Sequence, residues 1–298
     1  PWAILSYPNK SEPATLGFNA SRGHRRLNLQ SWFSNIGPAW FNEYAADWIG
    51  VELPAGGFKP ELLFLPFLAA GTTETDNLWK QTARGGMDVR YRPTSTLTGV
   101  VALNPDFRNI QSEVEGIDFS RSERRVGESR PFFQEGDDLF ETWAGVGQYF
   151  YSRRIEKIDL GTKFYGKLGK RTNLGVLSTY DFADQHGNPW RVHRQDYVAS
   201  LSQGAREWGL FSATGVWKRS EMEQNTVLGY RGRVRLQKNL SLDVRYGSSA
   251  WEGIEEASSK EFRRGALGNF SLNWWDGKLW FSPNFSFVSP KFQASNGL

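Results

Sequence analysis

Hydrophobic and polar residues alternate with a period of two along most of the chain. In residues 228–236, apolar side chains occupy one set of alternate positions, while Arg231, Arg233 and Arg235 lie in the other set. A short polar link leads to a second alternating run at 240–246. Two such runs joined by a short turn predict a β-hairpin with one apolar and one polar face.

The same pattern recurs elsewhere. Residues 266–274 and 281–287 form another pair of alternating runs, and Asp276-Gly277 between them is a strong signal for a two-residue turn. Pro283 argues against a central position for the second run, because proline cannot donate a hydrogen bond to a sheet. Consecutive antiparallel hairpins, roughly a dozen strands in all, are therefore expected. Further runs lie at 61–71, 87–92, 97–103, 160–168, 174–180, 197–201 and 208–217.

Composition favours a membrane β-barrel over a soluble β-protein. Aromatic residues make up 15% of the chain, with 13 Trp and 21 Phe, as is typical of the aromatic girdles of membrane barrels. The mean hydropathy of -0.53 fits a barrel in which only alternate residues meet lipid. We therefore predict an all-β fold, an antiparallel transmembrane β-barrel that is incomplete in this chain. A soluble all-β protein with the same alternation is the alternative.

The polar faces of the predicted strands are rich in arginine and lysine, and the chain has a net charge of +4. If the apolar faces meet lipid, these basic side chains point into the lumen, where fixed positive charge favours anions. A purely structural network is the alternative. Nucleic-acid binding is not expected, because acidic residues are interleaved with the basic ones and no recognised nucleic-acid fold matches. The candidate lumen-lining residues are Arg231, Arg233, Arg235, Arg245, Lys163, Lys167, Arg90 and Arg92.

Residues 106–148 interrupt the hairpins with a strongly charged, irregular segment. An irregular stretch of this length is unusual in a compact domain and is often functional. In a barrel it can fold inward and fill the lumen. We expect a plug-like segment whose charges form a network with the basic wall. The candidate members of this network are Glu123, Arg124, Arg125, Arg130, Glu135, Asp137, Asp138, Arg153 and Arg154.

Three short motifs follow one another in order, namely LNPDF at 103–107, RPFFQEG at 130–136 and FYSRRI at 150–155. Together they resemble a family of bacterial outer-membrane β-barrels of unknown function, in which the barrel commonly follows a family-9-type carbohydrate-binding module. The resemblance implies the outer membrane of a Gram-negative bacterium as the location and the lipid bilayer as a partner. Gln134 stands where the family usually has Leu, and residues 108–111 lack the usual acidic run, so the role of the segment stays open.

The same resemblance implies the domain organisation. Residues 1–50 resemble the last strands of the carbohydrate-binding module, a β-sandwich remnant with its linker, and 51–298 correspond to part of the barrel, with the plug-like segment at 106–148. The chain begins with Pro1, and residues 294–298 are not an aromatic closing strand. We therefore expect the chain to be truncated at both ends.

Catalytic and metal-binding patterns are weak. Glu113 and Glu115 would share one face of a strand, as two carboxylates of a glycoside hydrolase can, but the flanking arginines favour ordinary ion pairs. His24, His186 and His193 are scattered and do not predict a metal site. We expect neither an enzyme nor a cofactor.

The basic inner face and the charged segment favour a channel or transport-related barrel for a polar or anionic solute. The alternative is a surface protein that binds or processes glycans, for which the barrel is only a membrane anchor. Its support is a set of N-terminal tryptophans whose rings can stack on sugars, although they fit a core or a membrane-interface belt equally well. These are Trp2, Trp32, Trp40 and Trp48.

Overall fold

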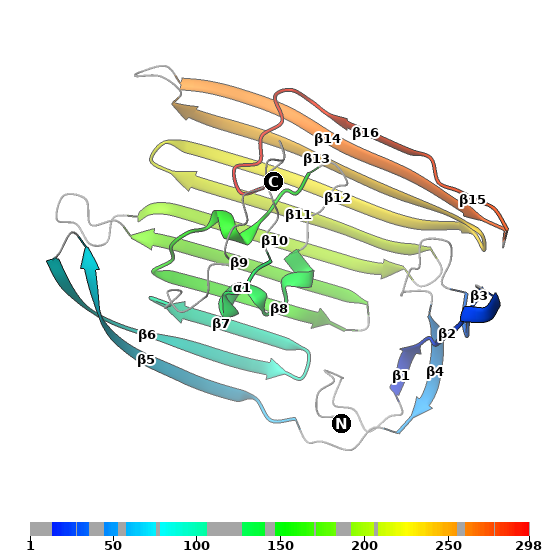
Figure 1. Cartoon of the computed structure of the whole chain (residues 1–298), viewed down its shortest axis with the longest axis horizontal. Coiled ribbons are helices and arrows are strands. Elements are labelled where there is room, and N and C mark those ends of the chain that lie inside the picture. Colours follow the sequence, from blue (N-terminus) through cyan, green and yellow to red (C-terminus); the bar gives the residue numbers. More distant parts are fainter. Residues whose placement is uncertain are drawn as a thin grey trace.

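A single large antiparallel sheet dominates the chain in the computed structural model (Figure 1). The structure describes residues 14–27, 29–35, 45–52, 58–75, 78–105, 127–140, 147–169, 171–182, 192–205, 208–254, 260–276 and 278–297. The prediction of an all-β, antiparallel fold is confirmed. No helix in the described part of the chain has the length and apolar character needed to cross a membrane.

The large sheet has twelve strands, and neighbours in sequence are neighbours in space from β5 to β15. This order is the consecutive-hairpin arrangement that the alternating pattern predicts. The strands are β5 (Glu61–Thr75), β6 (Leu78–Thr94), β7 (Leu97–Leu103), β8 (Leu160–Leu168), β9 (Thr172–Phe182), β10 (Val192–Ala205), β11 (Gly209–Ser220), β12 (Glu223–Gln237), β13 (Leu240–Ile254), β14 (Lys260–Trp275), β15 (Trp280–Phe281) and β16 (Asn284–Val288).

The sheet is open in the part of the chain that the structure describes. β5 forms one edge, and β15 and β16 pair in turn with β14 at the other, so no closed barrel is found. Pro283 lies between the two short edge strands. This position agrees with its predicted exclusion from the centre of the sheet, because an edge can lose one hydrogen bond to solvent.

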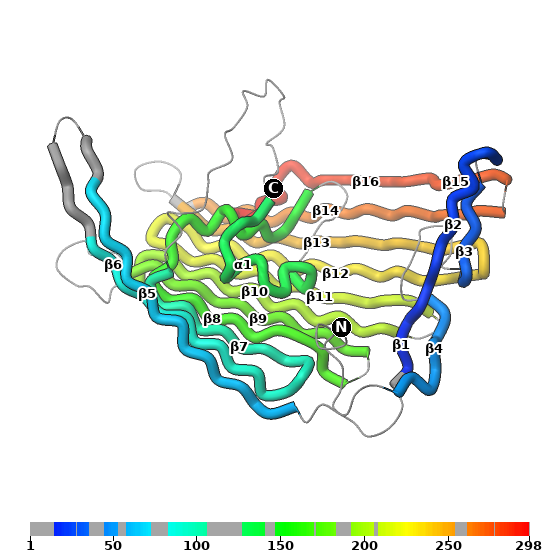
Figure 2. The backbone as a smooth tube through the Cα atoms, turned by 60° about the horizontal axis from the view of Figure 1, so that its bottom comes forward, coloured from blue at the N-terminus to red at the C-terminus, as the bar shows by residue number. Residues whose placement is uncertain are grey.

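One face of the sheet is covered by residues 127–140 and 147–158, which we call the covering segment (Figure 2). The segment contains α1 (Pro131–Gln134) and the short 3-10 helices η4 (Asp137–Phe140) and η5 (Ser152–Arg154). Residues 289–297 lie on the same face and reach the segment through a hydrogen bond from the Tyr151 amide to the Asn296 carbonyl (2.5 Å). The covering segment overlaps the C-terminal part of the plug-like segment that the sequence predicts at 106–148. Residues 106–126 and 141–146 of that range lie outside the described residues.

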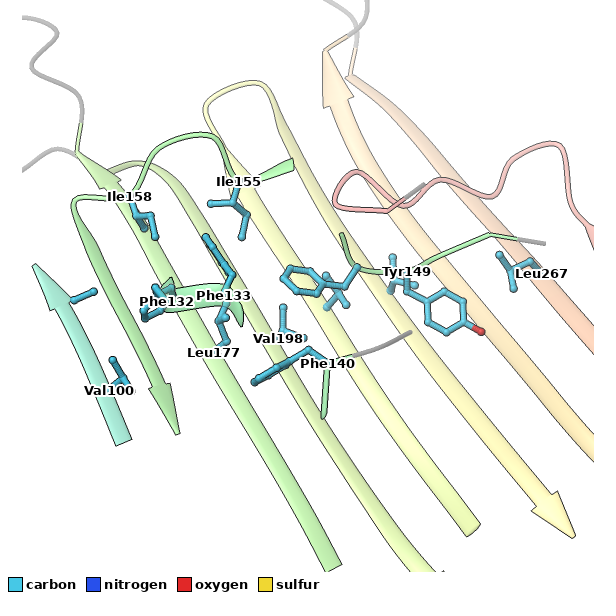
Figure 3. Packing of buried hydrophobic residues seen from close by; sticks show 14 residues of the cluster. Val100, Phe132, Phe133, Phe140, Tyr149, Ile155, Ile158, Leu177, Val198 and Leu267 are labelled. Carbon is cyan, nitrogen blue, oxygen red and sulfur yellow. The ribbon is translucent and has the colours of Figure 1, made fainter. Parts of the chain in front are cut away.

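The centre of this covered face is apolar. Five buried apolar side chains from five strands lie in one register row, and the buried side chain of Lys163 of β8 occupies the same row between two of them. They pack against Phe132, Phe133, Phe140, Tyr149 and Ile155 of the covering segment (Figure 3). Burial of one such side chain contributes roughly 1.5–3 kcal/mol. The polar, basic inner face expected from the sequence is thus interrupted at its centre, where the segment and the sheet form a hydrophobic core between them. The row consists of Val100, Leu177, Val198, Val216 and Val227.

Glycines in the sheet let the aromatic rings of the covering segment approach the strands closely. A Cβ at Gly161 would lie 2.7 Å from the Phe132 ring, and a Cβ at Gly175 would lie 2.9 Å from the Phe140 ring. Real Cβ contacts are essentially never shorter than 3.0 Å. The sheet is thus shaped to receive these rings.

The N-terminal region forms two separate two-stranded sheets. β1 (Ala14–Phe18) pairs with β4 (Ala46–Val51), and β2 (Ser21–His24) pairs with β3 (Leu29–Trp32). The 3-10 helix η2 (Arg25–Leu27) follows β2. The resemblance of residues 1–50 to the end of a carbohydrate-binding module stays a prediction.

Substitution of Gly161 by Ala should lower the free energy of unfolding by about 1–3 kcal/mol, because the added methyl group overpacks the Phe132 ring. Gly215→Ala on the opposite face is the control, since its Cβ would meet only Leu228 at an ordinary 3.6 Å. Urea titration followed by circular dichroism measures both changes. Equal stability of the two variants would contradict the assigned packing.

Candidate functional site

A compact ion pair fixes the start of the covering segment. Both side chains of Glu128 and Arg130 are 10% exposed, and Arg130 Nη2 lies 2.7 Å from Glu128 Oε2. Arg130 also donates from Nη2 to the Ser152 carbonyl (2.8 Å) and from Nη1 to the Ile155 carbonyl. Its guanidinium lies over the Phe133 ring at 4.2 Å from the centroid. These contacts join the two ends of the covering segment. Arg130, a member of the predicted network, therefore holds the segment together.

The pKa of the Glu128 carboxyl reflects two opposing effects. Burial by itself raises this pKa, but hydrogen bonds from Arg130 and from the Ser152 hydroxyl outweigh burial. The pKa is therefore held below its usual value, and the pair is charged at neutral pH.

A second set of polar contacts ties the segment to the wall at Glu135. The carboxylate of Glu135 forms an ion pair with Arg90 and accepts a hydrogen bond from the Tyr165 hydroxyl (3.2 Å). Lys163 donates to the backbone carbonyls of Phe132 and Glu135. The segment thus supplies one acid, Glu135, to a basic residue of the sheet, Arg90.

Other predicted lining residues have their described contacts elsewhere. Arg92 pairs with Glu61 of the edge strand at 3.7 Å, and Lys167 is exposed. Arg235 donates to the carbonyls of Asn35 and Lys238, both at 3.3 Å, near the end of its strand.

The remaining network candidates are distributed unevenly. Arg153 donates to the Gly127 carbonyl (2.7 Å) and Arg154 to the Gly297 carbonyl (3.2 Å). Asp137 and Asp138 both lie in η4. Glu123, Arg124 and Arg125, together with the carboxylate pair Glu113 and Glu115, lie outside the described residues.

Three arginines of the β12–β13 hairpin converge on one carboxylate. Asp243 Oδ1 lies 2.7 Å from Arg245 Nε, and its Oδ2 lies 3.3 Å from both Arg231 Nη2 and Arg233 Nε. The register explains the convergence, because Arg231 stands directly opposite Arg245, and Arg233 stands directly opposite Asp243. The structure thus brings together three of the eight predicted lining residues.

A cavity of about 240 Å³ lies between this arginine cluster and the covering segment. The segment contributes Asp138, Leu139 and Tyr149 to its lining. The rest of the wall is largely polar, and its polar side chains include three arginines and four serine or threonine hydroxyls. The wall side chains include Arg231, Arg233, Arg245, Asn173, Ser200, Ser202, Ser212 and Thr214.

Tyr149 closes one side of the cavity and was not foreseen from the sequence. Its ring would lie within 2.3 Å of a Cβ at Gly229 and within 2.4 Å of a Cβ at Gly247, so it rests on bare backbone of β12 and β13. The residue is 5% exposed, and its hydroxyl has no hydrogen-bond partner among the described residues. Burial raises the pKa of Tyr149 to about 12 although Arg245 opposes the rise, so the phenol is neutral. The signal that could have located it is the pair of glycines at register partners.

Residues 289–297 are hydrogen-bonded to side chains of β10 and β12 on the covered face. Asn296 is completely buried; its amide donates to Asp196 Oδ1 (2.7 Å), and its Oδ1 accepts from Arg194 (2.8 Å). Ser295 donates to Glu223 Oε2 (2.7 Å). No cluster of potential metal ligands occurs among the residues described.

Comparison with known families gives one match. Residues 60–170 match the family model described as "Domain of unknown function (DUF5916)". The match runs from β5 to β8 and includes the covering segment. A search of the curated proteins finds no match.

Acid should weaken the attachment of the covering segment through Glu128. Because the folded-state pKa lies below the unfolded one, near 4.3, the ion pair's stabilisation is complete above that value and is lost as the pH falls through the folded pKa. Glu128→Gln should therefore lower the free energy of unfolding by about 3 kcal/mol near neutral pH and reduce its loss on acidification.

Urea titrations at about pH 7 and about pH 3 measure this difference. Glu156→Gln in the same segment is the control, because its side chain is exposed. A wild-type and Glu128→Gln difference that does not shrink on acidification would contradict the assignment.

Tyr149→Phe should raise the free energy of unfolding by about 1 kcal/mol, because it removes a buried hydroxyl without a partner and keeps the ring. Tyr180→Phe should have the opposite effect, since its hydroxyl is 2.6 Å from that of Tyr197. Urea titration compares both variants with the wild type. Destabilisation by Tyr149→Phe would show that the hydroxyl is bonded.

Proposed function

We propose that this chain is part of an outer-membrane β-barrel protein of a Gram-negative bacterium, and that the barrel forms a passage for a polar or anionic solute. The observation that carries the proposal is the polarity of the two faces of the sheet. The uncovered face exposes apolar side chains, as the outer face of a membrane barrel does and the surface of a soluble protein does not. Large apolar side chains on the uncovered face are 36–55% exposed, whereas Arg231, Arg233 and Arg245 and most of the buried polar groups lie on the covered face. A surface of this kind fits lipid better than water. It is formed by Phe164, Val176, Leu201, Phe211, Leu228, Tyr230 and Phe270.

The lengths of the connections agree with this proposal. The strands are joined at one end by short turns around 95–96, 169–171 and 238–239. The opposite end carries the long connections from Leu103 to Leu160 and from Phe182 to Val192, together with the short turn from Ser220 to Glu223. Bacterial membrane barrels have short periplasmic turns and longer extracellular loops. In the proposed orientation the short-turn end faces the periplasm.

The covering segment would act as the gate of the passage. It occupies the face that would line the lumen, and polar contacts at Glu128 and Glu135 reinforce its apolar packing. The arginines beside it supply the positive field that favours anions. Opening would require part of the segment to leave the wall.

The glycan-binding alternative retains one supporting observation. Trp32 and Trp48 are 37% and 52% exposed in the N-terminal sheets. However, the contact from Arg235 to Asn35 joins this region to the short-turn end of the large sheet, which faces the periplasm in the proposed orientation. A surface glycan receptor would need the opposite side. Binding of the N-terminal region to a glycan array would favour the alternative.

Planar-bilayer recordings of the protein test the passage. The wild type should give small, anion-preferring currents, and Glu128→Gln should open more often because the segment is held less firmly. Deletion of residues 106–148 should increase the conductance further. Absence of conductance from all three proteins would refute the proposal.

A further inference from the structure

We infer that the cavity between Tyr149 and the arginine cluster is a binding site for a small sugar acid, a molecule with several hydroxyls and one carboxylate. The inference deepens the proposed function, because it names the class of solute, and it rests on that function for its biological meaning. The binding itself rests on the geometry of the cavity alone.

The size of the cavity restricts the ligand. Sites for drug-sized molecules occupy roughly 300–1,000 Å³, whereas this cavity has about 240 Å³. A single sugar ring is therefore a better match than an oligosaccharide.

Arg231 supplies the recognition of a carboxylate. It contacts Asp243 through Nη2 at 3.3 Å, and its Nε has no hydrogen-bond partner among the described residues. A guanidinium has five N–H donors in a planar fork that matches a carboxylate. The side chain is 27% exposed and lines the cavity, so a ligand can reach it.

The adjoining part of the wall, on β10 and β11, suits hydroxyl groups. Ser200, Ser202, Ser212 and Thr214 line the cavity, and each hydroxyl offers one donor and two acceptor positions. Thr214 donates to Ser200 at 3.2 Å, which leaves further capacity on both oxygens. A wall of this type distinguishes a sugar acid from a simple anion, because only the sugar acid uses both halves of the site.

The cavity also lies where a permeating solute would meet the segment. Tyr149 and η4 bound the cavity on the side of the covering segment. On the side of the sheet it is bounded by the Arg231–Arg245 pair, which lies nearer the short turns than the Gly229–Gly247 pair. A ligand bound there would touch both the fixed wall and the covering segment.

Calorimetric titration of the whole chain in detergent micelles tests the inference with D-glucuronate as the probe. D-glucose, which lacks the carboxylate, and acetate, which lacks the hydroxyls, should each bind at least about tenfold more weakly, since a charge-assisted hydrogen bond contributes about 1.5–3 kcal/mol. Inorganic phosphate should also bind more weakly. Equal affinity for glucuronate and either simple anion would overturn the assignment of a sugar acid.

Arg231→Gln should weaken glucuronate binding at least about tenfold, and Ser212→Ala should weaken it less. Arg219→Gln is the matched control, because it removes one positive charge from the exposed, opposite face of the neighbouring strand β11. Ser212→Ala also provides a test if Arg231→Gln does not fold. Binding that neither cavity variant weakens would refute the site.

The outcome is independent of the bilayer recordings. A protein that binds glucuronate but conducts no current would support the site and refute the passage. A protein that conducts anions but binds no glucuronate would refute only the site.

Discussion

The approach of aromatic rings to bare backbone is the contact on which the rest of this structure depends. Phe132, Phe140 and Tyr149 lie where glycines of the sheet leave room, and a single methyl group at those glycines would collide with each ring. The covering segment has few backbone hydrogen bonds of its own, since its helices are only a turn long. Packing against the sheet therefore determines its conformation, and the glycines determine where that packing is possible.

The polar contacts gain their strength from this apolar packing. Once Phe132 and Phe133 are buried, the charged groups beside them are removed from water and must find partners. Arg130 does so with Glu128 and two carbonyls, and Lys163 with two carbonyls. Buried pairs of this kind add little net stability, but the loss of one partner is costly. They fix the position of the segment rather than drive its attachment.

The sequence predicts the sheet well and the site only in part. A period of two specifies strands, their faces and their order, because every hairpin is local. The convergence of Arg231 and Arg245 follows from the register of one hairpin, so it was within reach. The sequence pattern does not reveal the apolar row through Val100 and Leu177. Each of these strands contributes only one residue of the row to the inner face, and serines and glycines at other inward positions make that face read as polar. Tyr149 was missed because its position depends on a contact between segments about 80 to 100 residues apart.

The distribution of acids argues for function over a purely structural network on the covered face. Where the covering segment is close to the wall, it supplies Glu135 to Arg90 and backbone carbonyls to Lys163, so the charges are satisfied by the fold. At the β12–β13 hairpin it leaves a cavity that Asp138 helps to line. Asp243 is shared there by three arginines, and Arg231 retains an Nε donor that no described group accepts. A cationic side chain in a confined, partly dehydrated space is costly unless something complements it. Hydrophobic residues of similar size would have filled the same space without that cost, so the cavity and its arginine are better explained by a ligand than by stability.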